Sequence, residues 1–217
     1  MLFHHFLFDF DGTLVNSSRL HEKAYRQTLA EHAPYALHCF DYGALRGLTT
    51  LDSFLRMGIT DSVLARCVAS KQERYRKAVS SGRLKPFPHT RTLLQTLIDQ
   101  GRHNYLVTSA STSSVELALE ALDLASFFSG IITASDSSVG KPAPDPYLAC
   151  LKRFGVPRSE AIVIEDASIG VTSARAAGLR VIGVHNEAIA DLVDFYFHDL
   201  AEMSSAVRDC GRQRRAA

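Results

Sequence analysis

The sequence predicts an α/β fold, with a Rossmann-like parallel sheet core and an inserted helical cap domain. Short apolar runs recur along the chain, and we interpret them as strands because they are too short for typical helices and several are β-branched. Helix-like segments alternate with the later runs, as expected for a parallel sheet covered by helices on both faces. The predicted strands are residues 6–8, 105–107, 130–133, 161–164 and 180–184.

The predicted helices fall into two groups. Segments 111–122, 144–154 and 168–177 lie between the later strands and should cover the sheet. Residues 16–82 break the alternation, contain no convincing strand, and include a helical apolar spacing over 61–80. We therefore predict a core domain formed by residues 1–15 and 83–217, and a cap domain formed by residues 16–82.

Composition narrows the class of protein. The chain has 217 residues, 46% of them apolar and 22% charged, which is typical of an ordinary globular protein. A formal net charge of +1 argues against nucleic acid or anionic membrane as a partner, and no apolar run approaches the roughly 20 residues that span a bilayer. Four dispersed cysteines form no CxxC pair, which favours free thiols in a cytoplasmic protein. No apolar seam marks an interface, so we expect a monomer.

Two acids, Asp9 and Asp11, follow the first apolar run in the stretch DFDGT. Residues two apart on an extended chain point to the same side, so both carboxylates are expected to face one site. Gly12 allows the chain to turn sharply behind them. Like charges this close are tolerated when a cation lies beside them or when one acid is protonated. Taken alone, the stretch is equally consistent with a turn built from Asp and Gly.

Three more polar motifs follow later strands. Thr108 and Ser109 begin a Ser/Thr-rich turn before a helix, where hydroxyl and N–H groups can bind phosphate, although simple helix capping also explains them. Lys141 stands in the sequence GKPAP, where the prolines restrict the direction of its ammonium group. Glu165 and Asp166 end the fourth predicted strand, and the following helix start also favours acids there.

All four motifs fall at the carboxyl ends of predicted strands. Sites in open parallel α/β sheets form beyond these ends, where the strand order reverses. If the first strand neighbours the fourth, Asp9, Asp11 and Asp166 converge into an oxygen-rich anionic site suited to Mg²⁺. Thr108 and Lys141 would then contact a phosphoryl group.

These residues, in this order, resemble the four motifs of the haloacid dehalogenase-like hydrolase superfamily. The resemblance covers almost the whole chain, because the helical segment after DFDGT matches the position of the cap in subclass I. It implies that Asp9 attacks phosphorus to form a transient aspartyl-phosphate, and that Asp11 transfers protons to and from the reacting oxygens. It also implies Mg²⁺ held by the Asp9 carboxylate, the Asp11 carbonyl and Asp166, with Glu165 in support.

The resemblance also implies how the phosphoryl group is bound and shielded. Thr108, the adjacent Ser109 and Lys141 would stabilise the charge on its oxygens. The cap would close over the site, exclude bulk water and select the substrate. Asp11 favours phosphate chemistry, because dehalogenases on this scaffold lack an acid there and phosphonate-cleaving members have a small residue.

Two branches of the superfamily remain: phosphatases of sugar or polyol phosphates, and beta-phosphoglucomutase. Cap residues His21 and Arg46 resemble positions of the mutase, and Arg76 stands near a basic cap position, although ordinary cap packing also accounts for all three. In contrast, Thr50 and the pair Ser111-Thr112 replace the charged residues that would hold a second phosphate.

We therefore predict a Mg²⁺-dependent phosphatase acting on a small phosphorylated metabolite, with Arg46 as a candidate phosphate ligand. A sugar phosphomutase is the alternative. A non-catalytic phosphate-binding protein is disfavoured, because the acids and Lys141 are all present.

Overall fold

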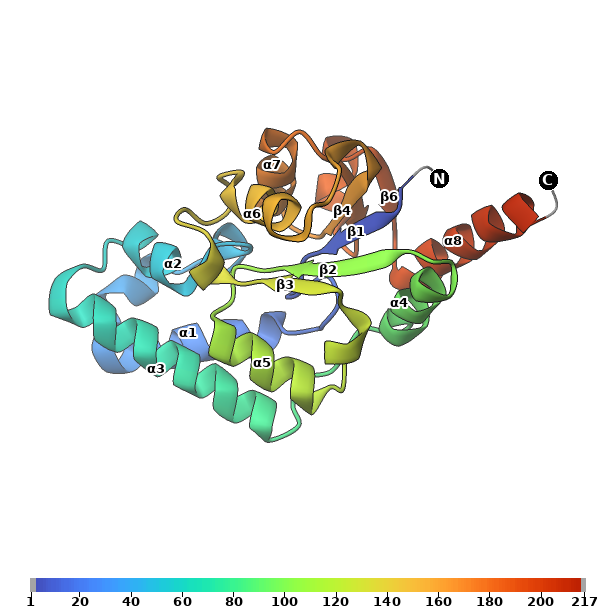
Figure 1. Ribbon diagram of the computed structural model, residues 1–217. Helices are drawn as coiled ribbons and strands as arrows, with labels where there is room; N and C mark the ends of the chain where they lie inside the picture. The colour runs from blue at the N-terminus through green and yellow to red at the C-terminus, as the bar shows by residue number, and fades with distance from the viewer. Residues whose placement is uncertain (1–2, 216–217) are drawn as a thin grey trace.

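A computed structural model describes residues 3–215, with side chains described through Asp209 (Figure 1). Its centre is a six-stranded sheet in the order β3-β2-β1-β4-β5-β6, with every neighbouring pair parallel. The predicted α/β fold and all five predicted strands are confirmed. The strands are β1 (His5–Phe8), β2 (His103–Val107), β3 (Gly130–Ile132), β4 (Ala161–Glu165), β5 (Arg180–Val184) and β6 (Phe195–Phe197).

The strand order reverses at β1. This strand pairs with β2 on one side and β4 on the other, so that Phe8 lies opposite both Leu106 and Ile164. The last residues of three strands therefore lie side by side at one edge of the sheet. This is the arrangement in which the predicted motifs converge.

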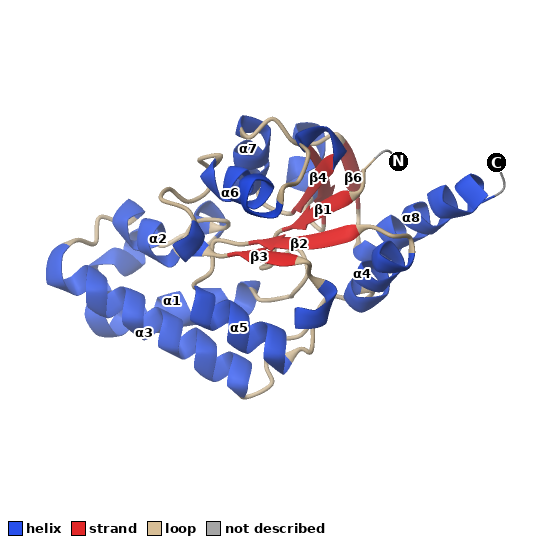
Figure 2. Cartoon of the chain, viewed as in Figure 1, coloured by secondary structure: helices blue, strands red, loops and turns tan. Residues whose placement is uncertain are grey.

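Helices cover both faces of the sheet (Figures 1 and 2). Side chains alternate between the faces, as the pleat requires, so Phe6 and Phe8 pack into one apolar cluster and Leu7 into the other. The first cluster is closed by α4, α5 and α8, and the second by α6 and α7. These helices are α4 (Thr90–Asp99), α5 (Thr112–Ala121), α6 (Asp145–Phe154), α7 (Ser168–Ala176) and α8 (Leu200–Arg215).

Residues 16–82, here called the helical insertion, lie beyond one end of the sheet (Figure 1). Among the described residues they form no strand, and α3 covers the predicted 61–80 segment. Their apolar side chains form a cluster of their own, although Tyr75 and Val79 near the end of α3 pack into the core cluster. That these residues act as a separate cap domain stays a prediction. Their helices are α1 (Ser18–His32), η1 (Pro34–Cys39), η2 (Gly43–Leu45), α2 (Thr50–Arg56) and α3 (Asp61–Ser80).

The expected free thiols are found at Cys39, Cys67 and Cys150, whereas the side chain of Cys210 lies outside the described part of the chain. Within residues 3–215, no helix combines the length and apolar character that crossing a membrane requires.

Candidate active site

Three carboxylates meet at the carboxyl ends of β1 and β4. One oxygen each from Asp9, Glu165 and Asp166 lies within 4.8 Å of the others, and each residue is at most 6% exposed. The register of the two strands explains this proximity, because the Asp9 N–H donates to the Ile164 carbonyl and so places Asp9 beside Glu165. Buried like charges at this spacing require cations nearby unless one of the acids is protonated.

Lys141 supplies one of these cations. Its Nζ donates to Asp9 Oδ1 and Glu165 Oε1, at 2.7 Å each, and to the Val107 carbonyl at 3.0 Å. Burial alone lowers the pKa of Lys141, but the two carboxylates outweigh burial and hold its pKa well above the ordinary value. The Tyr147 hydroxyl also donates to Glu165 Oε1 at 2.8 Å. The predicted fixed positive charge is therefore present in the described structure.

The three carboxylates fit a divalent cation. Burial raises the pKa of Asp9, Lys141 opposes this shift, and the Glu165 and Asp166 charges raise the pKa further. A bound cation would therefore help to keep Asp9 ionised. The backbone approaches the acids so closely that a Cβ on Gly12 would lie 2.3 Å from Asp166 Oδ2. A buried donor set made only of carboxylate oxygens suits Mg²⁺.

Asp11 lies in a different environment from Asp9. Its Oδ1 is 3.0 Å from Nε2 of His21 and accepts from the Tyr75 hydroxyl at 3.3 Å. Lys71 Nζ lies 2.9 Å from His21 Nδ1 and donates to Thr50 Oγ1 at 3.2 Å. A protonated lysine can only donate, so His21 Nδ1 accepts and its Nε2–H donates to Asp11. The chain Lys71–His21–Asp11 thus fixes a neutral histidine in one tautomer.

This chain also sets the charges in the helical insertion. Burial lowers the pKa of Lys71 to about 8, against the opposing effect of Asp11. Burial alone raises the pKa of Asp11, but the contact with His21, aided by Ser17 and Lys71, outweighs burial and lowers it to about 2. Asp11 is therefore a carboxylate in this arrangement.

A cavity lies between the strand ends and the helical insertion. Asp9, Asp11, Thr108 and Ser109 line it from the sheet side. Of the predicted site residues, Lys141, Glu165 and Asp166 contact one another or Asp9 without lining this cavity. The residues that line it from the insertion include His21, Tyr25, Tyr42, Arg46, Thr50, Lys71, Gln72 and Tyr75.

The predicted phosphate ligands are placed differently from one another. Thr108 Oγ1 accepts from the Ala110 N–H at 3.1 Å, so its own hydroxyl proton is directed away from this N–H and can be donated to another acceptor. Ser109 Oγ donates to the Gly47 carbonyl at 2.7 Å and thereby ties the sheet to the insertion. Arg46 forms an ion pair with Asp166. The phosphate-binding roles of these three residues stay predictions.

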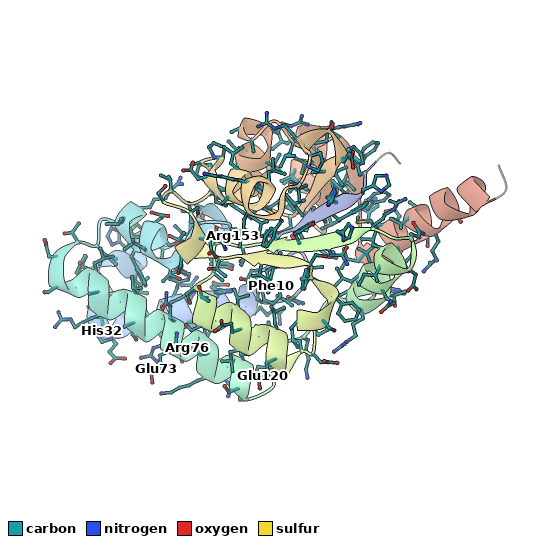
Figure 3. The ribbon with its side chains drawn as sticks, in the orientation of Figure 1. Phe10, His32, Glu73, Arg76, Glu120 and Arg153 are labelled. Atoms are coloured by element: carbon teal, nitrogen blue, oxygen red, sulfur yellow. The ribbon has the colours of Figure 1, made fainter. Side chains whose placement is uncertain are left out.

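Lys71 is the residue that the sequence interpretation missed. Lys71 lies four residues after Cys67 and four before Tyr75, so it stands on the buried stripe of α3. Lysines are rarely buried without a partner, so a lysine at this spacing could have been identified from the sequence as a candidate site residue. The sequence interpretation instead placed Arg76 near a basic cap position, with ordinary cap packing as the alternative. Figure 3 shows Arg76 on α3, and it is not among the described residues that line the cavity.

Comparisons with known proteins agree with the geometry. The chain matches the family described as haloacid dehalogenase-like hydrolase over residues 6–184. It is 30% identical to fructose-1-phosphate phosphatase YqaB of Escherichia coli (strain K12) over 188 residues, 82% of this chain and 94% of that protein. It is 31% identical to hexitol phosphatase A of the same organism over 206 residues, 92% of each protein.

A solved structure, beta-phosphoglucomutase from Clostridium difficile, superimposes with a TM-score of 0.82 over 99% of this chain and 100% of that one. At 19% sequence identity this similarity shows a shared fold. The match over residues 6–184 and the relatives above 30% identity show the family itself. The chain belongs to the haloacid dehalogenase-like hydrolase family.

Proposed function

We propose that this protein is a Mg²⁺-dependent phosphatase that hydrolyses a small sugar or polyol phosphate through an aspartyl-phosphate on Asp9. The observation that carries the proposal is the pair of acids at one cavity in opposite environments. Asp9 is bound to Lys141 within the carboxylate cluster, whereas Asp11 is bound to His21. Two acids held in different environments can perform different tasks in one reaction. Relatives named as fructose-1-phosphate and hexitol phosphatases support the substrate class.

The reaction would proceed in two displacements. An Asp9 carboxylate oxygen attacks phosphorus, the bond from phosphorus to the leaving oxygen breaks, and Asp11 gives its proton to that oxygen. Water then attacks phosphorus, Asp11 takes the proton, and the bond from Asp9 to phosphorus breaks to release phosphate. Mg²⁺, held by the Asp9 carboxylate, the Asp11 carbonyl and Asp166 with support from Glu165, would offset the negative charge of the phosphoryl group.

The contact of Asp11 with His21 favours one of these two displacements. His21 stabilises the carboxylate form of Asp11, which is the form that takes a proton from water. To donate a proton to the leaving group, Asp11 must be released from His21. Because His21 and Lys71 both belong to the helical insertion, a movement of the insertion away from the sheet would release it.

Lys141 and Thr108 would bind the oxygens of the phosphoryl group. Lys141 already donates to Asp9 and is held in place by Glu165, so its charge lies close to the proposed nucleophile before substrate binds. Thr108 is buried, lines the cavity and keeps a hydroxyl proton to donate. Groups placed in advance need not reorganise during the reaction, and this is how enzymes stabilise developing charge.

The side chains lining the cavity favour a phosphatase over the mutase alternative. Thr50 accepts from Lys71, and Ser111 Oγ donates to Ser114 Oγ at 3.0 Å. These neutral hydroxyls line the cavity at positions where, by the family resemblance, a mutase would carry charged groups for a second phosphate. The lysine among the described residues that line the cavity, Lys71, is already engaged by His21.

A screen of phosphorylated metabolites, with Mg²⁺ present and absent, tests the proposal. We expect Mg²⁺-dependent release of phosphate from sugar or polyol phosphates, and no turnover by a folded Asp9→Asn variant. Hydrolysis of a generic aryl phosphate by that variant at the parent rate would overturn the proposal. Isomerisation of a sugar phosphate faster than phosphate release, in the presence of a bisphosphate activator, would instead establish the mutase. We also expect a cytoplasmic monomer.

A further inference from the structure

Arg46 contacts the carboxylate cluster from the helical insertion. It follows the short turn η2 and forms an ion pair with Oδ2 of Asp166, whose side chain is 1% exposed. The other oxygen of Asp166, Oδ1, accepts from Thr13 Oγ1 at 3.1 Å. Each oxygen of this acid therefore has a partner within the chain.

The loop that carries Arg46 is fixed to the core on two sides. The Gly47 carbonyl accepts from Ser109 Oγ at 2.7 Å. Gly47 has a φ of +85°, and a Cβ there would lie 3.3 Å from Ile169 Cβ on α7. Close packing at both points directs the arginine side chain toward Asp166. The ion pair is thus a consequence of how the insertion is seated on the core.

The net charge of the carboxylate cluster can be balanced with either Arg46 or a divalent cation bound at Asp166, but not with both. Asp9, Glu165 and Asp166 carry three negative charges, and Lys141 offsets one of them. One divalent cation would offset the remaining two. With Arg46 also bound, the buried cluster would carry an excess positive charge, which a site sheltered from water disfavours.

Arg46 has space to leave Asp166. Its side chain is 30% exposed, and it borders both the catalytic cavity and a second cavity that also touches Arg56 and Ser168. Rotation of the arginine side chain would place its charge in the cavity lined by Asp9 and Asp11, where substrate is expected.

We infer that Arg46 and the divalent cation are alternative partners of Asp166, and that cation binding transfers Arg46 from Asp166 to the phosphate of the substrate. The inference rests on the proposed function. It makes Arg46 a substrate-binding residue that couples the two ligands, because the cation releases the guanidinium that phosphate then binds. By linkage, phosphate must strengthen cation binding by the same factor by which the cation strengthens phosphate binding.

Binding of Mn²⁺, an oxygen-preferring stand-in for Mg²⁺, tests this inference without any activity measurement. The full chain is freed of metal with a chelator and titrated with Mn²⁺, and free Mn²⁺ is measured by electron paramagnetic resonance with and without inorganic phosphate. Arg46→Gln should bind Mn²⁺ about tenfold more tightly than the parent, equivalent to about 1.4 kcal/mol. Phosphate should tighten Mn²⁺ binding in the parent more than in Arg46→Gln.

Arg56→Gln is the matched control, because Arg56 borders the second cavity beside Arg46 and, among the described contacts, forms no ion pair with Asp166. It removes the same charge from the insertion and should behave as the parent. Arg46→Lys, which keeps the charge but loses the planar fork, should bind Mn²⁺ with intermediate affinity and serves if Arg46→Gln does not fold.

Three results would overturn the inference. The first is equal Mn²⁺ affinity in Arg46→Gln and the parent. The second is that Arg56→Gln tightens Mn²⁺ binding as much as Arg46→Gln does. The third is the same effect of phosphate in the parent and Arg46→Gln. Absence of Mn²⁺ binding to every variant would instead remove the proposed metal site, and the inference with it.

Discussion

The Lys71→Met variant removes a buried positive charge. This charge contacts His21 in the cavity, but burial destabilises it. Lys71 is 5% exposed, lies 4.7 Å from the centre of the Tyr25 ring and donates to Thr50. Burial lowers its pKa from 10.5 to about 8. Between these values the unfolded chain binds the proton more tightly than the folded chain does, so the stability of the folded state rises as pH increases.

The size of this effect follows from the two pKa values. One pKa unit corresponds to about 1.36 kcal/mol, so the charged Lys71 destabilises the folded state by about 3 kcal/mol near pH 7. Near pH 10 the folded-state amine is neutral and the remaining penalty is about 1 kcal/mol. The free energy of unfolding of the parent should therefore gain roughly 2–3 kcal/mol from this lysine over that interval.

Urea unfolding of the parent and Lys71→Met, each near pH 7 and near pH 10, measures this gain. The parent's free energy of unfolding should rise relative to that of the variant by roughly 2–3 kcal/mol, since other titrating groups are common to both proteins. Lys77→Met is the matched control on the same helix, because its lysine side chain is 76% exposed and should cause no such change. Curves for Lys71→Met and the parent that stay parallel across pH would refute the reasoning.

Two further variants test how Glu165 is held. Tyr147→Phe removes the hydroxyl that donates to Glu165 at 2.8 Å, and should lower the free energy of unfolding by about 1.5–3 kcal/mol in urea titrations; an unchanged value would contradict this donor role. Gly170→Ala places a Cβ 1.8 Å from Glu165 Oε1, which Lys141 also holds, and should destabilise the protein by about 1–3 kcal/mol. It should also weaken Mn²⁺ binding in calorimetric titration, and unaltered binding would show that Glu165 moves freely.

The parts of this protein that could be predicted from sequence have local signals. Asp9, Glu165 and Asp166 come directly after apolar runs, so strand prediction alone places them at one edge of the sheet. Lys141 is flanked by residues that stiffen its loop, and its ammonium group is buried between two carboxylates as a fixed charge would be. The order of these motifs then carries the family resemblance, which the match over residues 6–184 confirms.

The parts that could not be predicted depend on contacts between distant segments. Lys71 contacts His21 across 50 residues, because α3 packs against α1, and no local pattern specifies that packing. Arg46 meets Asp166 across 120 residues, so its sequence neighbourhood suggests a phosphate ligand but not the acid that it contacts. Tyr147 has the spacing of an ordinary core residue on α6, and only the structure shows its hydroxyl at Glu165.

Strand β6 and helix α8 were also not predicted. Strand β6 has three residues, is partly exposed and pairs only with β5, so it lacks the continuous apolar run of a buried strand. Along α8, Leu200, Met203 and Val207 are spaced for one buried face, but charged and small residues between them obscure the pattern.

The most direct test of the central claim is to trap the covalent intermediate on Asp9. The parent is mixed with a radiolabelled phosphate monoester identified by the screen, in the presence of Mg²⁺, and quenched in acid. We predict that the label is found on the peptide containing Asp9, is released by hydroxylamine as expected of an acyl phosphate, and is absent from Asp9→Asn. Label on a different residue, or turnover by Asp9→Asn at the parent rate, would contradict the account.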